Sequence, residues 1–103
     1  MLIGIDLATK KTGICILDKN DNKVSIKYKD VIVLDKFSQE TLQANTNAIL
    51  NKLNSLKIKF NINVCDKIFV EYNSGYTNTT ACGLYAGLIL SVFPQTIFIE
   101  AYA

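Results

Sequence analysis

Two carboxylates at the ends of apolar segments are the residues of this sequence best suited to chemistry. Asp6 and Glu71 lie near the ends of residues 2–7 and 67–72. If these segments form adjacent parallel strands, the two carboxylates sit on backbones about 4.8 Å apart and repel each other. A divalent cation removes that repulsion, and Mg²⁺ or Mn²⁺ prefers such oxygen ligands. The pair therefore predicts a metal site.

Each carboxylate alone also has a structural explanation. An aspartate after a strand often bonds to its own backbone in a turn, and a glutamate at a strand end is often simply solvated. The functional interpretation depends on the pair, because ligands of open α/β sheets gather at the carboxyl edge of the strands. The expected position of Asp6 and Glu71 on neighbouring strands favours it.

The sequence contains no histidine, which excludes several catalytic and metal-binding arrangements. A Ser–His–Asp triad, a Cys–His nucleophile and a His-ligated zinc site cannot be built. Acid–base catalysis would have to come from metal-bound water. Two ions about 4 Å apart can activate water and stabilise a leaving phosphate oxygen. We therefore expect metal-assisted hydrolysis.

Polar and aromatic residues near the two carboxylates could contact nucleic acid. Lys10 and Lys11 follow Asp6 in the first turn, where they could meet phosphate oxygens, although a solvated lysine turn explains them equally well. A second group brackets Glu71 and could stack on bases or hydrogen-bond to them, while its tyrosines could instead pack at a strand edge. This group comprises Tyr72, Asn73, Ser74, Tyr76 and Asn78.

The composition indicates one compact domain. The chain has 103 residues, half of them hydrophobic, and its net charge of +2 neither identifies nor excludes a polyanionic partner. It is too short for the two lobes of an actin-like or sugar-kinase ATPase. Cys15, Cys65 and Cys82 lack C-x-x-C spacing and lie among apolar residues, so we expect buried thiols in a reducing cytoplasm. No signal peptide or membrane span is visible, and we expect a cytoplasmic protein.

Apolar and alternating segments predict five strands, and two segments with helical periodicity predict two helices. The order is βββαβαβ, and a right-handed crossover places the fourth strand beside the first. This predicts an α/β protein with a mixed five-stranded sheet of order 3-2-1-4-5, the ribonuclease H-like arrangement. The expected strands are residues 2–7, 12–17, 24–28 continued by 31–34 after a kink, 67–72 and 95–100.

The two expected helices differ in character. The first should begin after Ser38 as N-cap, with Glu40 in its first turn. Its asparagines and lysines should face water, opposite an apolar stripe of Leu42, Ile49, Leu53 and Leu56. The second, from Thr79 or Thr80 to Val92, contains no charged residue. Packing against the first helix explains part of this composition, and a homodimer contact around Gly83–Leu90 would explain the rest.

Two segments resemble the motifs of a known nuclease family. Residues 3–13, IGIDLATKKTG, resemble the first-strand motif of RuvC-like Holliday junction resolvases, and residues 68–73, IFVEYN, resemble their second motif. Residues 78–90 are similar to the helix that follows. The first motif is shared with YqgF-type proteins and with the phosphate loop of actin-like kinases. The glutamate that closes the fourth strand favours the RuvC-like family.

The resemblance implies a dimeric, Mg²⁺-dependent endonuclease that cuts four-way DNA junctions with four acidic residues. Asp6 matches the first of these and Glu71 the second. The other two belong to a carboxyl-terminal helix after the fifth strand, and this sequence ends before it. Glu100 resembles a strand residue of the family rather than a ligand. We expect residues 1–103 to be a single ribonuclease H-like domain without that helix, either a fragment or a shortened relative that binds without cutting.

We therefore expect a nuclease that acts on branched DNA with Mg²⁺ or Mn²⁺ and uses Asp6 and Glu71 as metal ligands and catalytic residues. Two alternatives stay open. One is a non-catalytic DNA-binding or dimerising module that kept the fold, and the other is a YqgF-type RNA-processing nuclease. Junction cleavage, junction binding without cleavage and cleavage of single-stranded RNA would distinguish the three.

Overall fold

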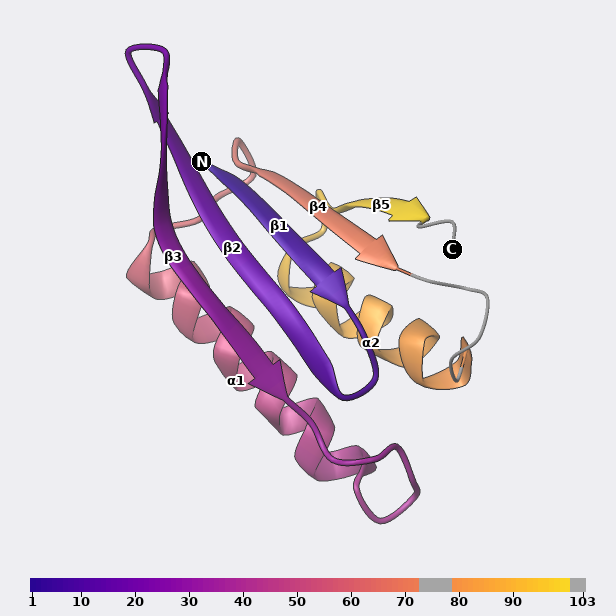
Figure 1. Cartoon of the computed structure of the whole chain (residues 1–103). Coiled ribbons are helices and arrows are strands. Elements are labelled where there is room, and N and C mark those ends of the chain that lie inside the picture. Colours follow the sequence, from indigo (N-terminus) through magenta and orange to yellow (C-terminus); the bar gives the residue numbers. More distant parts are fainter. Residues whose placement is uncertain (73–78, 101–103) are drawn as a thin grey trace.

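The computed structural model describes residues 1–72 and 79–100 (Figure 1). The predicted order of strands and helices is confirmed. The elements are β1 (Leu2–Leu7), β2 (Lys11–Asn20), β3 (Lys23–Val33), α1 (Leu42–Lys59), β4 (Lys67–Tyr72), α2 (Thr79–Val92) and β5 (Ile97–Glu100).

The strands form one sheet in the order β3-β2-β1-β4-β5. β1 pairs antiparallel with β2 and parallel with β4, and β4 pairs parallel with β5. α1 provides the crossover that a parallel neighbour of β1 requires. The predicted ribonuclease H-like sheet is therefore confirmed, and it brings the carboxyl ends of β1 and β4 to the same edge.

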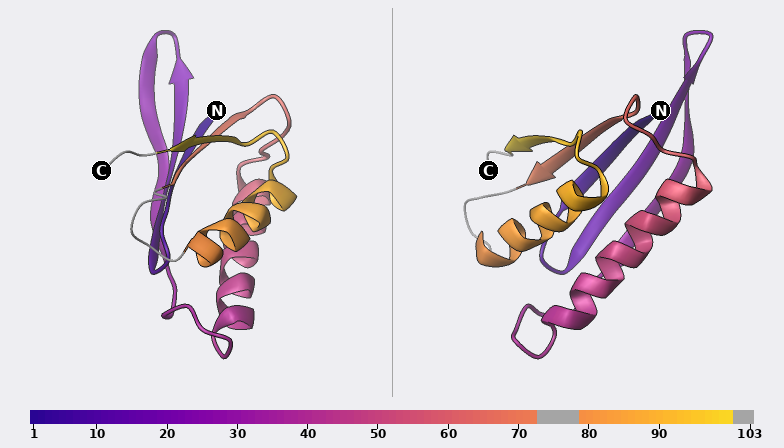
Figure 2. Two further views of the ribbon diagram at one scale, coloured as in Figure 1. Left: turned by 90° about the vertical axis from the view of Figure 1, so that its right-hand side faces the viewer. Right: turned by 180° about the vertical axis from the view of Figure 1, so that it is seen from behind.

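Both helices cover one face of the sheet, and no helix among the described residues lies on the other (Figure 2). Strand alternation builds the covered face, where Ile3 and Ile5 of β1 and Ile68 and Val70 of β4 are at most 3% exposed. These side chains share one core cluster with helix residues that include Ile49, Leu53, Tyr85 and Ile89. The residues between them on each strand point to the helix-free face.

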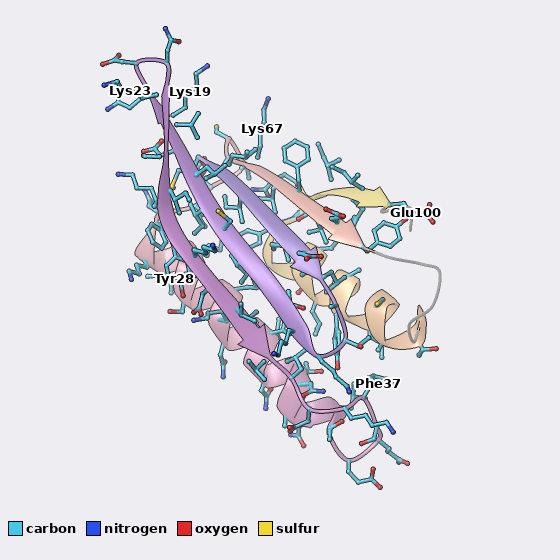
Figure 3. The ribbon with its side chains drawn as sticks, viewed as in Figure 1. Lys19, Lys23, Tyr28, Phe37, Lys67 and Glu100 are labelled. Carbon is cyan, nitrogen blue, oxygen red and sulfur yellow. The ribbon has the colours of Figure 1, made fainter. Side chains whose placement is uncertain are left out.

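The β2–β3 hairpin is longer than predicted. β3 is one strand instead of two pieces, because a bulge between Ile16 and Leu17 absorbs the register shift while pairing continues. The chain reverses at Asp21 and Asn22, whose φ values of 50° and 68° are left-handed and suit these residue types. Lys19 and Lys23 flank this tip, at the end of the sheet opposite to the carboxyl end of β1 (Figure 3).

α1 begins later than predicted. The predicted N-cap, Ser38, and the predicted first-turn acid, Glu40, both precede the helix, whose N-cap is Thr41 without a side-chain cap hydrogen bond. The Thr41 hydroxyl donates to the Lys36 carbonyl oxygen at 2.7 Å, and the hydroxyls of Ser38 and Thr41 lie 3.1 Å apart. These bonds fold residues 36–41 into their own turn, so the helix starts only at Leu42.

One asparagine of α1 is buried instead of solvated, contrary to the prediction for this helix. Asn45 is 2% exposed, and its side-chain amide group donates to the Asp35 carbonyl oxygen at 2.9 Å and to the Tyr85 hydroxyl at 3.0 Å. Its side-chain oxygen accepts the Asp35 N–H at 3.1 Å. Asn45 thus joins the segment after β3 to both helices.

The cysteines are not uniformly buried as predicted. Cys82 is buried, Cys15 is half-buried and Cys65 is exposed. Cys65 lies in the turn before β4, where its N–H donates to the Asn63 side-chain oxygen at 2.9 Å. Because this turn runs over the surface of the protein, the side chain of Cys65 is not packed into the core.

α2 covers the sheet with only part of its surface. Tyr85 and Ile89 are at most 1% exposed, whereas Leu84 and Leu90 are 46% and 41% exposed. The two outward leucines lie on the same side of the helix as Gly83 and Gly87, which are also exposed. Neither described helix is long and apolar enough to cross a membrane.

A charged cluster ties β3 to α1 and predicts a pH dependence. The Lys52 ammonium, the Tyr28 hydroxyl and the Val31 N–H donate hydrogen bonds to Asp30 and hold the pKa of its carboxyl far below the usual value. Tyr28 lies over α1 in Figure 3. The carboxyl of Asp30 has a lower pKa in the folded than in the unfolded protein, where it is about 3.9, so its ionised form stabilises the fold. This stabilisation is complete above about pH 3.9 and is lost as the pH falls toward the pKa of the folded protein.

We therefore expect the urea midpoint of the wild type to fall more steeply between pH 5 and pH 2 than that of Asp30→Asn, as measured by circular dichroism. Asp21→Asn, at the hairpin tip, is the matched control and should keep the wild-type slope. An identical slope in Asp30→Asn and the wild type would contradict the assignment.

Candidate functional site

The carboxylates singled out in the sequence are direct neighbours in the sheet. β1 and β4 are parallel, and their register places Asp6 opposite Glu71. The backbones of paired strands lie about 4.8 Å apart, and paired residues project from the same face. Both side chains are exposed, and both project from the helix-free face. The structure therefore brings the two predicted ligands together.

The pair belongs to a row of side chains that crosses the helix-free face. Read from β3 to β5, this acid row consists of Val31, Gly13, Asp6, Glu71 and Ile99. A second row lies two residues nearer the start of β1 and consists of Lys29, Cys15, Gly4, Phe69 and Ile97. All of these residues except Ile97 line a shallow groove of about 410 Å³.

The donor set of the pair suits a hard divalent cation. Neither Asp6 nor Glu71 forms an ion pair with a described residue. Two carboxylates side by side without a neutralising cation repel each other, and Mg²⁺ and Mn²⁺ favour carboxylate oxygens. Across residues 1–72 and 79–100, no three His, Cys, Asp or Glu side chains gather in a group that could hold a metal. The pair would thus supply only part of a coordination shell.

The turn that carries Lys10 and Lys11 is held from two sides. The Thr12 hydroxyl donates to the Ala8 carbonyl oxygen at 3.0 Å and accepts the Ala8 N–H at 3.2 Å. The Leu34 N–H donates to the Lys10 carbonyl oxygen at 2.7 Å, which fixes the turn to the end of β3. Both lysines are exposed at the edge where β1 ends.

Of the site residues predicted around Glu71, the structure describes only Tyr72, and it does not lie at the pair. Tyr72 is half-buried on the helix-covered side and packs against Phe98, with the ring centroids 6.2 Å apart. Glu100 pairs with Tyr72 and not with Glu71, so it lies on that side too, at the end of β5 (Figure 3). Asn73, Ser74, Tyr76 and Asn78 lie outside the described residues.

Of the residues in the two rows that line the groove, only Asp6 and Glu71 were predicted from the sequence. Gly4 and Phe69 follow from the alternation that places Asp6 and Glu71 on one face, so the strand pattern alone could have found them. Gly13 and Lys29 required the register of β2 with its neighbours. A bulge in the β2–β3 pairing makes that register unreadable from the sequence.

No protein-family model matches the sequence, and no curated protein matches it significantly. The fold is similar to that of Thermus thermophilus RuvC in complex with a Holliday junction substrate, with a TM-score of 0.73 and 16% identity over 96% of this chain and 62% of RuvC. A Fowlpox virus resolvase, in complex with Holliday junction DNA, gives a TM-score of 0.51 and 12% identity over 97% of this chain and 58% of the resolvase.

The fold is shared beyond resolvases. A Ppx/GppA family member from Aquifex aeolicus gives a TM-score of 0.60 and 10% identity over 96% of this chain and 34% of its own. At such identities the likeness establishes the fold alone, and this chain spans less than two thirds of each of the three. The described elements therefore form a ribonuclease H-like fold that two Holliday junction resolvases share.

Proposed function

We propose that this protein is a metal-dependent nuclease that hydrolyses phosphodiester bonds in branched DNA, with four-way junctions as its substrate. The observation that carries the proposal is the exposed, in-register pair of Asp6 and Glu71 on adjacent parallel strands. Its support is the resemblance of both flanking segments to RuvC-like motifs and the fold shared with two resolvases.

Each residue has a defined task in this proposal. Asp6 and Glu71 hold Mg²⁺ or Mn²⁺ through their carboxylate oxygens, and because the described residues offer only these two ligands, binding is weak and turnover slow. When bound, the cation supplies Lewis-acid stabilisation of the phosphate and activates water. Lys10 and Lys11 contact phosphates beside the pair. Asn73, Ser74, Tyr76 and Asn78 complete the proposed nucleic-acid contacts, whereas Tyr72 packs against Phe98 on the helix-covered side.

The test is cleavage of an end-labelled synthetic four-way junction in Mg²⁺ or Mn²⁺, beside single-stranded RNA of the same length. Paired symmetric nicks that disappear in EDTA support the resolvase. Cleavage of the RNA alone would instead indicate the YqgF-type alternative. Junction binding with both substrates intact would indicate the non-catalytic module, and the catalytic proposal would then be withdrawn.

The role of the two turn lysines predicts a change in salt dependence. Replacing Lys10 and Lys11 by alanine should weaken junction binding roughly tenfold and lower the slope of log affinity against log salt by about 2, because each lysine neutralises one phosphate. Fluorescence anisotropy over a salt series measures this. Lys19→Ala with Lys23→Ala, at the hairpin tip, is the matched control, and an unchanged slope in the Lys10 and Lys11 variant would contradict the assignment.

We further propose that two copies associate through the outward side of α2. Leu84 and Leu90 are exposed there, and Gly83 and Gly87 leave room for close approach. Leu84→Glu should weaken the dimer at least about tenfold, because a charge would be buried in the contact. Light scattering at micromolar concentration should show half the wild-type mass. Ile58→Glu, on α1 and 82% exposed, should leave it unchanged. A monomeric wild type would contradict the proposal.

A further inference from the structure

Thr12 carries a buried hydroxyl that the packing of the core does not require. Its side chain is 3% exposed and stands opposite the buried Ile32 of β3, on the helix-covered face of the sheet. Burying a hydroxyl costs free energy unless it finds hydrogen-bond partners. A valine at this position would have the same branched shape and would suit a strand equally well. The hydroxyl of Thr12 is therefore explained by the bonds that it forms and not by its packing.

These bonds close the turn between β1 and β2. The Thr12 hydroxyl donates to the Ala8 carbonyl oxygen at 3.0 Å and accepts the Ala8 N–H at 3.2 Å, so one oxygen atom binds both backbone groups of one residue. The pairing of β1 with β2 ends at Asp6 and Gly13. Beyond that pair, the side chain of Thr12 takes over the bonding that backbone groups provide along the strands.

Lys10 and Lys11 lie inside the turn that Thr12 closes. The Lys10 carbonyl oxygen accepts the Leu34 N–H at 2.7 Å, so the turn is also fixed at its middle. Both lysine side chains are exposed, and neither forms an ion pair with a residue in 1–72 or 79–100. A fixed backbone below free cationic side chains lowers the ordering cost that is met when an anion binds.

The bonds of Thr12 act on the lysines rather than on the carboxylate pair. Asp6 is held by strand pairing on both sides, with Gly13 on β2 and with Glu71 on β4. Those backbone pairs do not involve the Thr12 hydroxyl. Loss of the hydroxyl should thus loosen the turn and leave the two proposed metal ligands in place.

We propose that Thr12 is a positioning residue, whose hydroxyl holds the turn in the shape in which Lys10 and Lys11 meet the phosphates of the substrate. Thr12 is buried and touches no substrate itself. The role rests on the proposed function, which makes the two lysines phosphate contacts. Without the hydroxyl, the turn has to be ordered when DNA binds, and this cost lowers the affinity.

The test removes the hydroxyl and keeps the shape of the side chain. Thr12→Val loses only the hydrogen bonds and should melt roughly 5 °C below the wild type. Ile16→Val, at a fully buried position further along β2, should cost about as much stability and is the matched control. Thr12→Ser keeps the hydroxyl. The probe is a fluorescein-labelled four-way junction, titrated without divalent cation so that it is not cut, and followed by anisotropy.

Thr12→Val should weaken junction binding about three- to tenfold, at most as much as replacing both lysines by alanine. The slope of log affinity against log salt should stay at the wild-type value, because both lysines still neutralise phosphates. Thr12→Ser and Ile16→Val should bind like the wild type. Without DNA, the NMR order parameters of the Lys10 and Lys11 amides should fall in Thr12→Val.

A double-mutant cycle shows whether the hydroxyl acts through the lysines. Adding Thr12→Val to the variant with alanine at positions 10 and 11 should weaken binding no further, since the contacts that the turn positions are already gone. A further loss in this background would overturn the proposal. Unchanged order parameters in Thr12→Val, or an equal loss of affinity in Ile16→Val or Thr12→Ser, would overturn it too.

This inference and the proposed function fail in different ways. A wild type that binds the junction, beside a Thr12→Val variant that binds it equally well, removes the role of Thr12 and leaves the nuclease standing. A wild type that binds no junction overturns the proposed function, and the role of Thr12 with it, because the turn would then have no phosphate to meet.

Discussion

Asp6→Asn is expected to slow junction cleavage by at least about 100-fold, because cation catalysis supplies several kcal/mol and each 1.4 kcal/mol is a factor of ten. The substitution keeps the size of the side chain but removes one of the two anionic ligands. The structure offers no nearby replacement, since no third His, Cys, Asp or Glu joins the pair among the described residues. Single-turnover cleavage of a labelled junction in Mg²⁺ measures the loss.

Two companion variants make this result specific. Glu71→Gln should lose activity to a similar extent, because Glu71 is the in-register partner of Asp6. Asp18→Asn should keep wild-type activity, since Asp18 lies on β2 outside the groove, with its carboxylate 3.9 Å from the Lys27 ammonium. If Asp6→Asn retained more than a tenth of the wild-type rate, the carboxylate pair would not be the catalytic centre.

Asn45→Ala is expected to lower the free energy of unfolding by about 2–3 kcal/mol, because it removes one buried and two partly buried hydrogen bonds. The Tyr85 hydroxyl loses the Asn45 donor, and the Asp35 N–H and carbonyl oxygen lose both of their side-chain bonds. For a domain of this size the melting temperature should fall by roughly 10 °C or more. Differential scanning calorimetry measures both quantities.

The control for this prediction lies two residues away. Asn47 is exposed on the same helix, so Asn47→Ala should change the stability by less than about 0.5 kcal/mol. Tyr85→Phe removes only the hydroxyl and should cost less than Asn45→Ala, and the double variant should lose less than the sum of the two. Strict additivity would show that the Asn45–Tyr85 hydrogen bond does not stabilise the protein.

The bounds of a strand or helix could be predicted from the sequence where its local residue pattern agrees with its place in the fold. β1, β4 and α2 have the predicted bounds, because apolar runs closed by a carboxylate, and an uncharged helix followed by Pro94, leave few alternatives. The neighbourhood of Asp6 and Glu71 followed from the right-handed crossover. That Asp6 and Glu71 lie directly opposite each other could not be predicted, because it depends on the parallel register of β1 and β4.

Where polar side chains bond to particular partners, two predictions for the first helix were wrong. Ser38 looks like an N-cap, but its hydroxyl lies against the Thr41 hydroxyl before the helix begins. The sequence pattern places Asn45 on the solvent-exposed face of the helix. In the structure its side chain is buried and donates a hydrogen bond to Tyr85, 40 positions away. Local propensity carries no information about such partners.

The groove could not be predicted from the sequence either, because it depends on which residues of different strands pair with each other. Gly4 and Gly13 read as ordinary members of a strand motif, and Lys29 reads as one lysine among eleven. Only the registers of β2 with β1 and β3 place them beside the carboxylates. The space above Gly4 is a property of the folded sheet and not of any segment of the chain.

The central claim is that Asp6 and Glu71 together hold a divalent cation, and paramagnetic Mn²⁺ titration of the ¹⁵N-labelled protein tests it most directly. The account predicts that the amide signals of Asp6 and Glu71, with those of their row neighbour Gly13, broaden first. The same titration should leave the hairpin tip at Asp21 sharp, and Asp6→Asn should abolish the effect at Glu71. Broadening centred on Asp21, or none near Asp6 and Glu71 at millimolar Mn²⁺, would contradict the claim.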